Sequence, residues 1–193
     1  MIKPQIWVMR GQFTGDIKME TEEQWLQLQN SYTQFVLEYA QLAQELNAEL
    51  FCIGTELEQF VNNRPEYWYQ LIQDIKKIYK GKLTYAANWD EYKRTPFWEE
   101  LDLIGIDAYF PLSDLQTPSV DDCKNGLKPW KFEMQQLSVA LNRKIVFTEF
   151  GYRSMDYAAK QPWLADRNTE KVNEQAQANA TQAFIEELWF EDW

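Results

Sequence analysis

Two glutamates stand at the ends of segments that the sequence predicts to be buried strands. Glu56 closes the run 49–56, and Glu149 lies near the end of the run 144–151. Glu is unfavourable in strands, so a carboxylate at this position needs hydrogen-bonding partners or solvent. The chain has no His and only two Cys, which excludes histidine-based triads and most catalytic zinc sites. Acid–base chemistry must therefore come from carboxylates, Tyr or Lys, and the two glutamates are the leading candidates.

Two carboxyl groups can break a glycosidic bond with retention of configuration when about 5–5.5 Å separates them. One carboxyl keeps its proton near neutral pH, through burial or a neighbouring negative charge, and protonates the leaving oxygen. The other stays ionised and attacks the anomeric carbon. A single strand-end glutamate could instead cap a helix or pair with an arginine. Two strand-end glutamates beside Trp and Tyr favour a catalytic site for glycoside cleavage. This chemistry requires no metal ion and no organic cofactor.

The strand ends and the loops after them also supply hydrogen-bond donors and aromatic rings. The donors that could keep one carboxylate ionised, and that are expected to bind the substrate, are Asn88, Tyr109 and Arg153. The rings that could stack on the C–H faces of a sugar are Trp7, Trp89 and Trp163. Most of the other aromatic residues are expected to be ordinary core residues.

Strands and helices alternate along the predicted chain. The predicted strands cover residues 2–9, 49–56, 82–89, 103–110 and 144–151. The first predicted helix follows a capping box at Thr21 and Gln24 and carries one apolar stripe from Trp25 to Leu46. The other predicted helices cover roughly 67–78, 92–101, 130–141 and 172–189, and long loops are predicted at 113–128 and 152–167. Strands separated by helices must be parallel, with the helices outside the sheet. The order predicts an α/β fold, either an open doubly wound sheet or part of a (β/α) barrel.

The alternation of side chains along a strand predicts which residues share a face with Glu56. If the Glu56 side chain points into the site, Cys52 and Gly54 share its face, and the bulkier residues between them turn towards the helices. By the same rule, Asp107 and Tyr109 share one face of a later strand.

Composition excludes several classes of protein. The formal net charge is −11 and no basic cluster offsets it, so binding to a nucleic acid is not expected. No apolar run approaches the roughly 18 residues of a membrane span, and the first residues lack the features of a signal peptide. The expected partner is an oligosaccharide or polysaccharide, because a neutral ligand is unaffected by this charge.

The segments around the two glutamates resemble the catalytic strands of clan A glycoside hydrolases, most closely those of family 113, which is known for β-mannanase activity. These segments read FCIGTEL from Phe51 and FTEFGY from Phe147, and weaker matches fall at residues 3–5, 85–89 and 105–111. The resemblance implies that Glu56 is the general acid/base on the fourth barrel strand and Glu149 the nucleophile on the seventh. It also implies that Trp89, Asp107 and Tyr109 lie at the mouth that binds the sugar.

Two departures from the family pattern concern Gln5 and the length of the chain. Gln5 stands where many relatives are expected to have His, which changes the substrate contacts expected near the third strand. A (β/α)8 barrel takes about 250 residues, whereas the chain has 193 and about five strand–helix units. Residues 1–193 are therefore interpreted as one incomplete catalytic domain, a partial (β/α)8 barrel of about five parallel strands, the third to the seventh. We expect this piece to be weakly active or inactive in isolation, and its localisation stays open.

Two alternatives to a retaining, mannan-cleaving hydrolase remain open from the sequence. The first is a catalytically silent carbohydrate-binding barrel, or a truncated inactive fragment, which would use the aromatic residues without chemistry. The second is an unrelated nucleotide-binding α/β protein. The second lacks support, because the chain has no G-x-G-x-x-G, no G-x-x-x-x-G-K-[ST] and no G-x-S-x-G motif.

Overall fold

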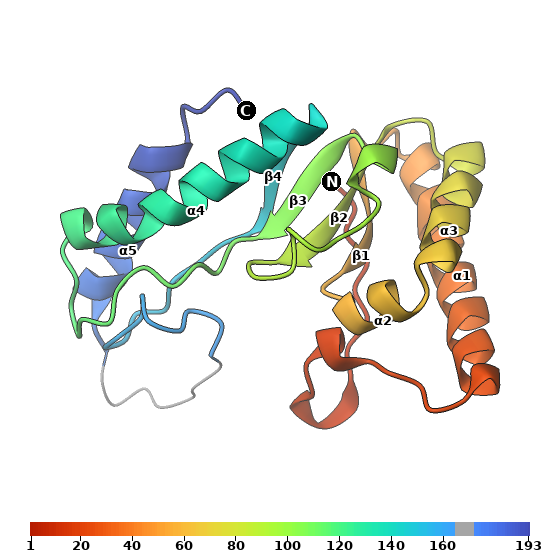
Figure 1. The fold of residues 1–193 in the computed structure, drawn as a ribbon, viewed down its shortest axis with the longest axis horizontal. Coiled ribbons are helices and arrows are strands. Elements are labelled where there is room, and N and C mark those ends of the chain that lie inside the picture. The colour runs from red at the N-terminus through yellow and green to blue at the C-terminus, as the bar shows by residue number, and fades with distance from the viewer. Residues whose placement is uncertain (165–171) are drawn as a thin grey trace. The chain divides into compact units, whose positions relative to one another are not determined.

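The computed structural model describes residues 1–164 and 172–193 and has an α/β fold (Figure 1). The helices are α1 (Glu22–Glu45), α2 (Glu58–Asn63), α3 (Pro65–Ile78), α4 (Val120–Leu141) and α5 (Glu174–Leu188). The strands are β1 (Leu50–Thr55), β2 (Lys82–Asn88), β3 (Leu103–Asp107) and β4 (Lys144–Glu149). The four strands are parallel and follow one another in the sheet in the order β1-β2-β3-β4. This confirms the predicted α/β class with parallel strands.

The first predicted strand is reduced to a single bridge. Ile2 pairs in parallel with Phe51 of β1, its amide donating to the Leu50 carbonyl over 3.0 Å. Residues 3–8 have no regular structure, and Pro4 lacks the amide proton that a ladder would need. The predicted helix at 92–101 is likewise shortened, to turns and a 3-10 helix at Trp98–Glu100. The last residues of the predicted loop, 165–167, lie outside the described residues.

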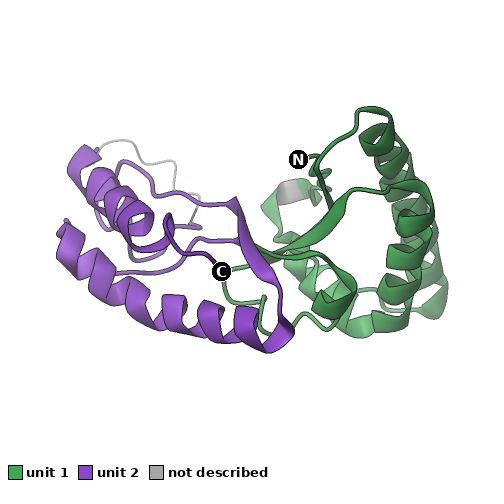
Figure 2. Cartoon of the chain, turned by 90° about the horizontal axis from the view of Figure 1, so that it is seen from above, with its two compact units in different colours: residues 1–106 green, residues 107–193 purple. Residues whose placement is uncertain are grey.

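The chain divides into two compact units, residues 1–106 (unit 1) and 107–193 (unit 2), which Figure 2 distinguishes by colour. In unit 1, α1 and α3 lie against each other beside the strands (Figure 1). The capping box predicted at the start of α1 is present, since the Gln24 amide donates to the Thr21 hydroxyl and the Gln24 side chain accepts in return. Among the described residues no helix is long and apolar enough to cross a membrane.

Unit 1 has an aromatic core centred on Trp68 of α3, which is fully buried. Among the described residues, five rings lie around the Trp68 ring, with centroid distances of 5.5 Å to Tyr32, 5.2 Å to Phe60, 6.0 Å to Tyr67, 5.7 Å to Tyr85 and 5.6 Å to Phe97. Edge-on, tilted and stacked contacts of this kind add to the hydrophobic stabilisation that large rings provide. Most of the aromatic residues of unit 1 therefore serve the core, as the sequence predicts.

Gly54 of β1 faces this aromatic core, and this corrects one prediction. A Cβ at Gly54 would lie 2.8 Å from the Tyr32 hydroxyl of α1 and 2.9 Å from the Trp68 ring of α3. Gly54 therefore lies on the face of β1 that α1 and α3 cover. The prediction that Gly54 turns away from the helices is wrong. Simple alternation fails because the pairing of β1 with β2 is irregular between Cys52 and Thr55, and because Glu56 leaves the extended conformation.

Unit 2 contains a helix that begins earlier than its sequence indicates. Helix α4 starts at Val120 after a Ser119 capping box and includes both Gly126 and Pro129, so much of the predicted loop 113–128 is helical. A Cβ at Gly126 would lie 1.8 Å from the Leu112 carbonyl oxygen. The glycine is therefore required by close packing of the helix on another segment, a tertiary cause that helix propensity does not reveal.

Candidate active site

Glu56 follows β1 directly and is held in a left-handed backbone conformation, with φ of 49°. This conformation is costly for a residue other than Gly, Asn or Asp, and such residues gather at functional sites. Two hydrogen bonds hold the backbone here. The Glu56 amide donates to the Ala86 carbonyl over 2.8 Å, and the Leu57 amide donates to the Tyr85 hydroxyl over 2.6 Å. The neighbouring strand β2 therefore determines the course of the chain at Glu56.

Asn88 ends β2, and its side chain closes the turn that follows. The Asn88 side-chain oxygen accepts the Trp89 amide over 2.9 Å, and the Asn88 carbonyl accepts the Glu91 amide over 2.9 Å. Asn88 and Trp89 are both half-buried. These two predicted sugar-contacting residues thus stand at the end of β2 and in the turn that follows it, and β2 pairs with the strand that precedes Glu56.

Glu91 is a buried carboxyl in this turn that the sequence analysis missed. The residue is 2% exposed, accepts the Tyr85 hydroxyl over 2.7 Å and accepts the Asn88 amide over 3.1 Å. Burial raises the pKa of the Glu91 carboxyl to about 8, although these two hydrogen bonds oppose the shift. No signal in the sequence identifies it, because a glutamate in a polar turn is typical of a solvated loop.

Glu149, the last residue of β4, forms a cluster with the end of β3 in unit 2. The Tyr109 hydroxyl donates to one Glu149 carboxylate oxygen over 2.9 Å, and the Ala108 amide donates to the Glu149 carbonyl over 2.7 Å. The structure therefore brings together Tyr109 and Glu149, two of the residues selected from the sequence. A hydroxyl donor favours the ionised form of a carboxylate, the form that a nucleophile needs.

Asp107 is placed differently from the other predicted sugar-contacting residues. Its side chain is fully buried, and one carboxylate oxygen accepts the Thr148 hydroxyl over 2.6 Å. A carboxylate in this position fixes the residue that precedes Glu149 in the chain. Its burial favours a supporting role beneath the site over direct contact with a sugar.

The remaining predicted residues lie in segments without regular structure. Trp7 is 85% exposed and Trp163 is 42% exposed, whereas Arg153 is half-buried in the segment after β4. Exposed indole rings of this kind could stack on the face of a sugar. Their contact with a sugar stays a prediction. The pairing of Glu56 with Glu149 also stays a prediction, since the two belong to different units.

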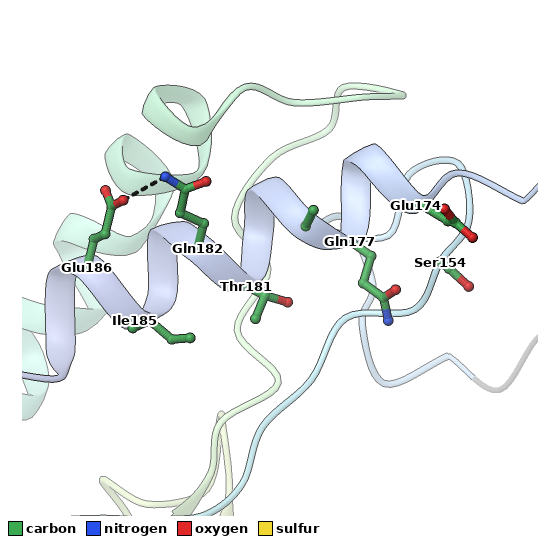
Figure 3. A pocket seen from close by; sticks show the side chains of 8 residues that line it. Ser154, Glu174, Gln177, Thr181, Gln182, Ile185 and Glu186 are labelled. Carbon is green, nitrogen blue, oxygen red and sulfur yellow. Dashed lines mark hydrogen bonds between the residues drawn. The ribbon is translucent and has the colours of Figure 1, made fainter.

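A hollow of about 910 Å³ lies elsewhere in unit 2, along α5 (Figure 3). Polar side chains dominate its lining, and Figure 3 shows Gln182 donating to Glu186, a bond of 2.6 Å. The lining residues are Ser154, Glu174, Gln177, Ala178, Thr181, Gln182, Ile185 and Glu186. None of the candidate residues lines it, so it is separate from the sites described above. Among residues 1–164 and 172–193, no group of three or more Cys, Asp and Glu side chains is arranged to hold a metal ion.

Comparison with solved structures shows the same fold in known glycosidases. A GH113 β-1,4-mannanase in a complex matches 99% of this chain and 59% of its own, with a TM-score of 0.79 and 23% identity. A GH113 β-mannanase from Alicyclobacillus acidocaldarius in complex with ManMIm matches 90% of this chain and 52% of its own, with a TM-score of 0.73 and 25% identity. A β-glucuronidase from Ruminococcus gnavus is more distant, with a TM-score of 0.64 and 14% identity.

The chain thus spans between 52% and 59% of the length of these mannanases, and the likeness confirms the predicted partial (β/α)8 barrel. No curated protein matches the chain. The family model of Glycoside Hydrolase Family 113 matches residues 1–193, the full length given. The chain belongs to glycoside hydrolase family 113.

Proposed function

We propose that this chain carries the catalytic residues of a retaining glycoside hydrolase that cleaves β-1,4-mannosidic bonds. Membership of family 113 supports a glycosidase, and two of the similar structures are described as β-1,4-mannanases. The observation that carries the proposal is the hydrogen bond from the Tyr109 hydroxyl to the Glu149 carboxylate at the end of β4. It provides a strand-end carboxylate with a donor that favours its nucleophilic, ionised form.

In the first step, a Glu149 oxygen attacks the anomeric carbon and Glu56 donates its proton to the departing glycosidic oxygen. A covalent glycosyl ester forms on Glu149, and the shortened glycan leaves. In the second step, Glu56 removes a proton from water, the water attacks the same carbon, and the ester bond breaks. Two inversions at one carbon give a product with the configuration of the substrate.

The other candidate residues take binding roles in this proposal. Asn88, at the end of β2, and Trp89, directly after it, would supply an amide group and an indole ring. Trp7, Trp163 and Arg153 would bind sugar units further along the glycan. Asp107 would hold Thr148 and thereby the end of β4.

Two measurements on the protein that carries this chain test the proposal. Incubation with β-1,4-mannan should release reducing ends faster than incubation with cellulose. Proton NMR of the earliest products should show the β-anomer first, because a retaining enzyme keeps the configuration. An α-anomer formed first would contradict the double displacement.

A carbohydrate-binding protein without hydrolytic activity is the second candidate, and the exposed rings of Trp7 and Trp163 favour it. Such a protein would bind manno-oligosaccharides, measured by calorimetry, and would release no reducing ends. Binding without hydrolysis by the protein that carries this chain would establish this alternative.

A further inference from the structure

We propose that Glu91 is a positioning residue for Glu56, acting through the Tyr85 hydroxyl and the Leu57 amide. The inference rests on the proposed function, because it gives Glu56 the role of acid/base. Its basis is a continuous set of hydrogen bonds within unit 1, from the Glu91 carboxyl to the residue that follows Glu56.

The backbone at Glu56 needs support from its surroundings. Its φ of 49° is unfavourable for a glutamate, so neighbouring contacts must hold it. The Leu57 amide is one of these contacts, and its acceptor is a side-chain hydroxyl, that of Tyr85, at 2.6 Å. Leu57 itself is 1% exposed, so water cannot readily replace this acceptor.

The Tyr85 hydroxyl can accept this amide in one orientation only. The Tyr85 oxygen can accept a hydrogen bond from the Leu57 amide only if the hydroxyl proton points in another direction. That proton points to the Glu91 carboxyl, which accepts the hydrogen bond with an oxygen–oxygen distance of 2.7 Å. Tyr85 is fully buried against the aromatic core, so its ring has little freedom to move. Glu91 therefore determines how this hydroxyl is oriented.

The other oxygen of the Glu91 carboxyl accepts a hydrogen bond from the Asn88 amide, at the end of β2, over 3.1 Å. Through the Tyr85 hydroxyl, this buried side chain thus connects the end of β1, which bears Glu56, with the end of β2, which bears Asn88. An outer link accompanies this one, since the Arg94 guanidinium binds the Glu58 carboxylate over 2.6 Å. The outer link is partly exposed and is expected to contribute little.

A carboxyl group is needed at position 91, and a glutamine cannot fully replace it. Both oxygens of a carboxyl group keep lone pairs that can accept a hydrogen bond, even when one of them is protonated, whereas the nitrogen of a glutamine amide can only donate. In Glu91→Gln, either the Tyr85 hydroxyl or the Asn88 amide loses its partner. A buried group left unpaired carries a desolvation cost, and the strand end is expected to shift.

The test compares two substrates that differ in their need for a general acid. β-1,4-Mannan has a poor leaving group and requires protonation, whereas 2,4-dinitrophenyl β-mannobioside has a leaving group that departs without it. A misplaced Glu56 should therefore slow the first more than the second. We expect Glu91→Gln and Tyr85→Phe to lower kcat/KM on mannan by about tenfold or more and on the aryl substrate by less than about threefold.

The matched control is Glu100→Gln, which makes the same change at a partly exposed ion pair with Lys76 in the same unit. It should leave both rates unchanged. Equal losses on the two substrates, or no loss on either, would overturn the proposal. A wild-type protein that hydrolyses neither substrate would instead contradict the proposed function.

Amide hydrogen exchange tests the hydrogen-bond chain without any assay of activity. The Leu57 amide should be protected in the wild type, and Tyr85→Phe should speed its exchange by about tenfold or more, with no change in Glu100→Gln. Rapid exchange in the wild type would overturn the proposal even if the variants fail to fold.

Discussion

The two glutamates occupy equivalent places in sequence, at the end of a strand, yet the two units hold them by different means. In unit 1 the backbone of Glu56 is bent into a left-handed conformation and is secured by β2 and its buried turn. In unit 2 Glu149 is an ordinary strand residue, and the contact that distinguishes it is made by its side chain with Tyr109. Position in the chain thus identifies both residues, but it does not reveal how each is oriented.

The surroundings of the two strands differ as well. All residues of β1 after Leu50 are buried, whereas those of β4 after the exposed Lys144 are half-buried. Aromatic rings from α1, α3 and β2 pack over Gly54 of β1, whereas Phe147 of β4 packs against the Phe184 ring of α5, with a centroid distance of 4.9 Å. The conformational strain at Glu56 accordingly lies in the more tightly packed of the two regions.

Replacement of the glutamates themselves should have the largest effect on activity. We expect Glu56→Gln and Glu149→Gln each to lower kcat on β-1,4-mannan by about 10²- to 10⁴-fold, with no loss of fold. An aryl substrate should separate the two, because the first variant can still form the glycosyl ester and release a burst of phenolate. A burst of phenolate from Glu149→Gln would contradict its role as the nucleophile. Turnover at the wild-type rate by either variant would contradict a catalytic role for that glutamate.

Truncation of core rings should show the difference in packing. Trp68→Ala should lower the free energy of unfolding by about 3–5 kcal/mol, because it empties the centre of a buried cluster. Phe147→Ala should cost roughly half as much, since the residue is half-buried. Urea unfolding followed by tryptophan fluorescence for Phe147→Ala, and by circular dichroism for both, measures these losses. Equal losses would show that the two regions are packed alike.

Glu91 should make unit 1 less stable as pH rises. Its pKa in the folded protein is about 8, above the ordinary 4.5, so between these values the folded state keeps a proton that the unfolded chain releases. The free energy of unfolding should therefore fall from about pH 5 to pH 8. Tyr85, Glu58 and Arg94 face this carboxyl, and the chain has no His to titrate in the same range.

Urea unfolding at several pH values checks this expectation. Glu91→Gln should flatten the slope between pH 5 and pH 8, whereas Glu100→Gln should retain it. Identical slopes in the wild type and Glu91→Gln would mean that Glu91 ionises as freely in the folded protein as in the unfolded chain.

The smallest effect is expected from the hydroxyl that binds Glu149. Tyr109→Phe removes one donor to the carboxylate and should lower kcat on mannan by about tenfold, with a change in stability of about 0.5–1.5 kcal/mol. Tyr157→Phe, at a half-exposed tyrosine of the same unit, is the matched control and should leave kcat unchanged. If both variants behave alike, the contact with Tyr109 is structural only.

Much of the local structure could be predicted because its causes are local. The capping box at Thr21, the apolar runs of the four strands and the alternation with helices all act within a few residues. Helix α4 was predicted about ten residues short because Gly126 and Pro129 normally interrupt helices. The need for glycine at position 126 comes from its contact with Leu112, which lies outside α4 and is not a near neighbour of Gly126 in the chain.

By itself, the sequence determined the fold class, the family and the two strand-end glutamates, since residue types and short motifs carry that information. Only the tertiary structure decided which face of β1 meets the helices, the left-handed turn at Glu56 and the place of Glu91. The physical reason is that these features depend on hydrogen bonds and packing between separate segments. A carboxylate in a polar turn has the same sequence signature whether it is solvated or buried.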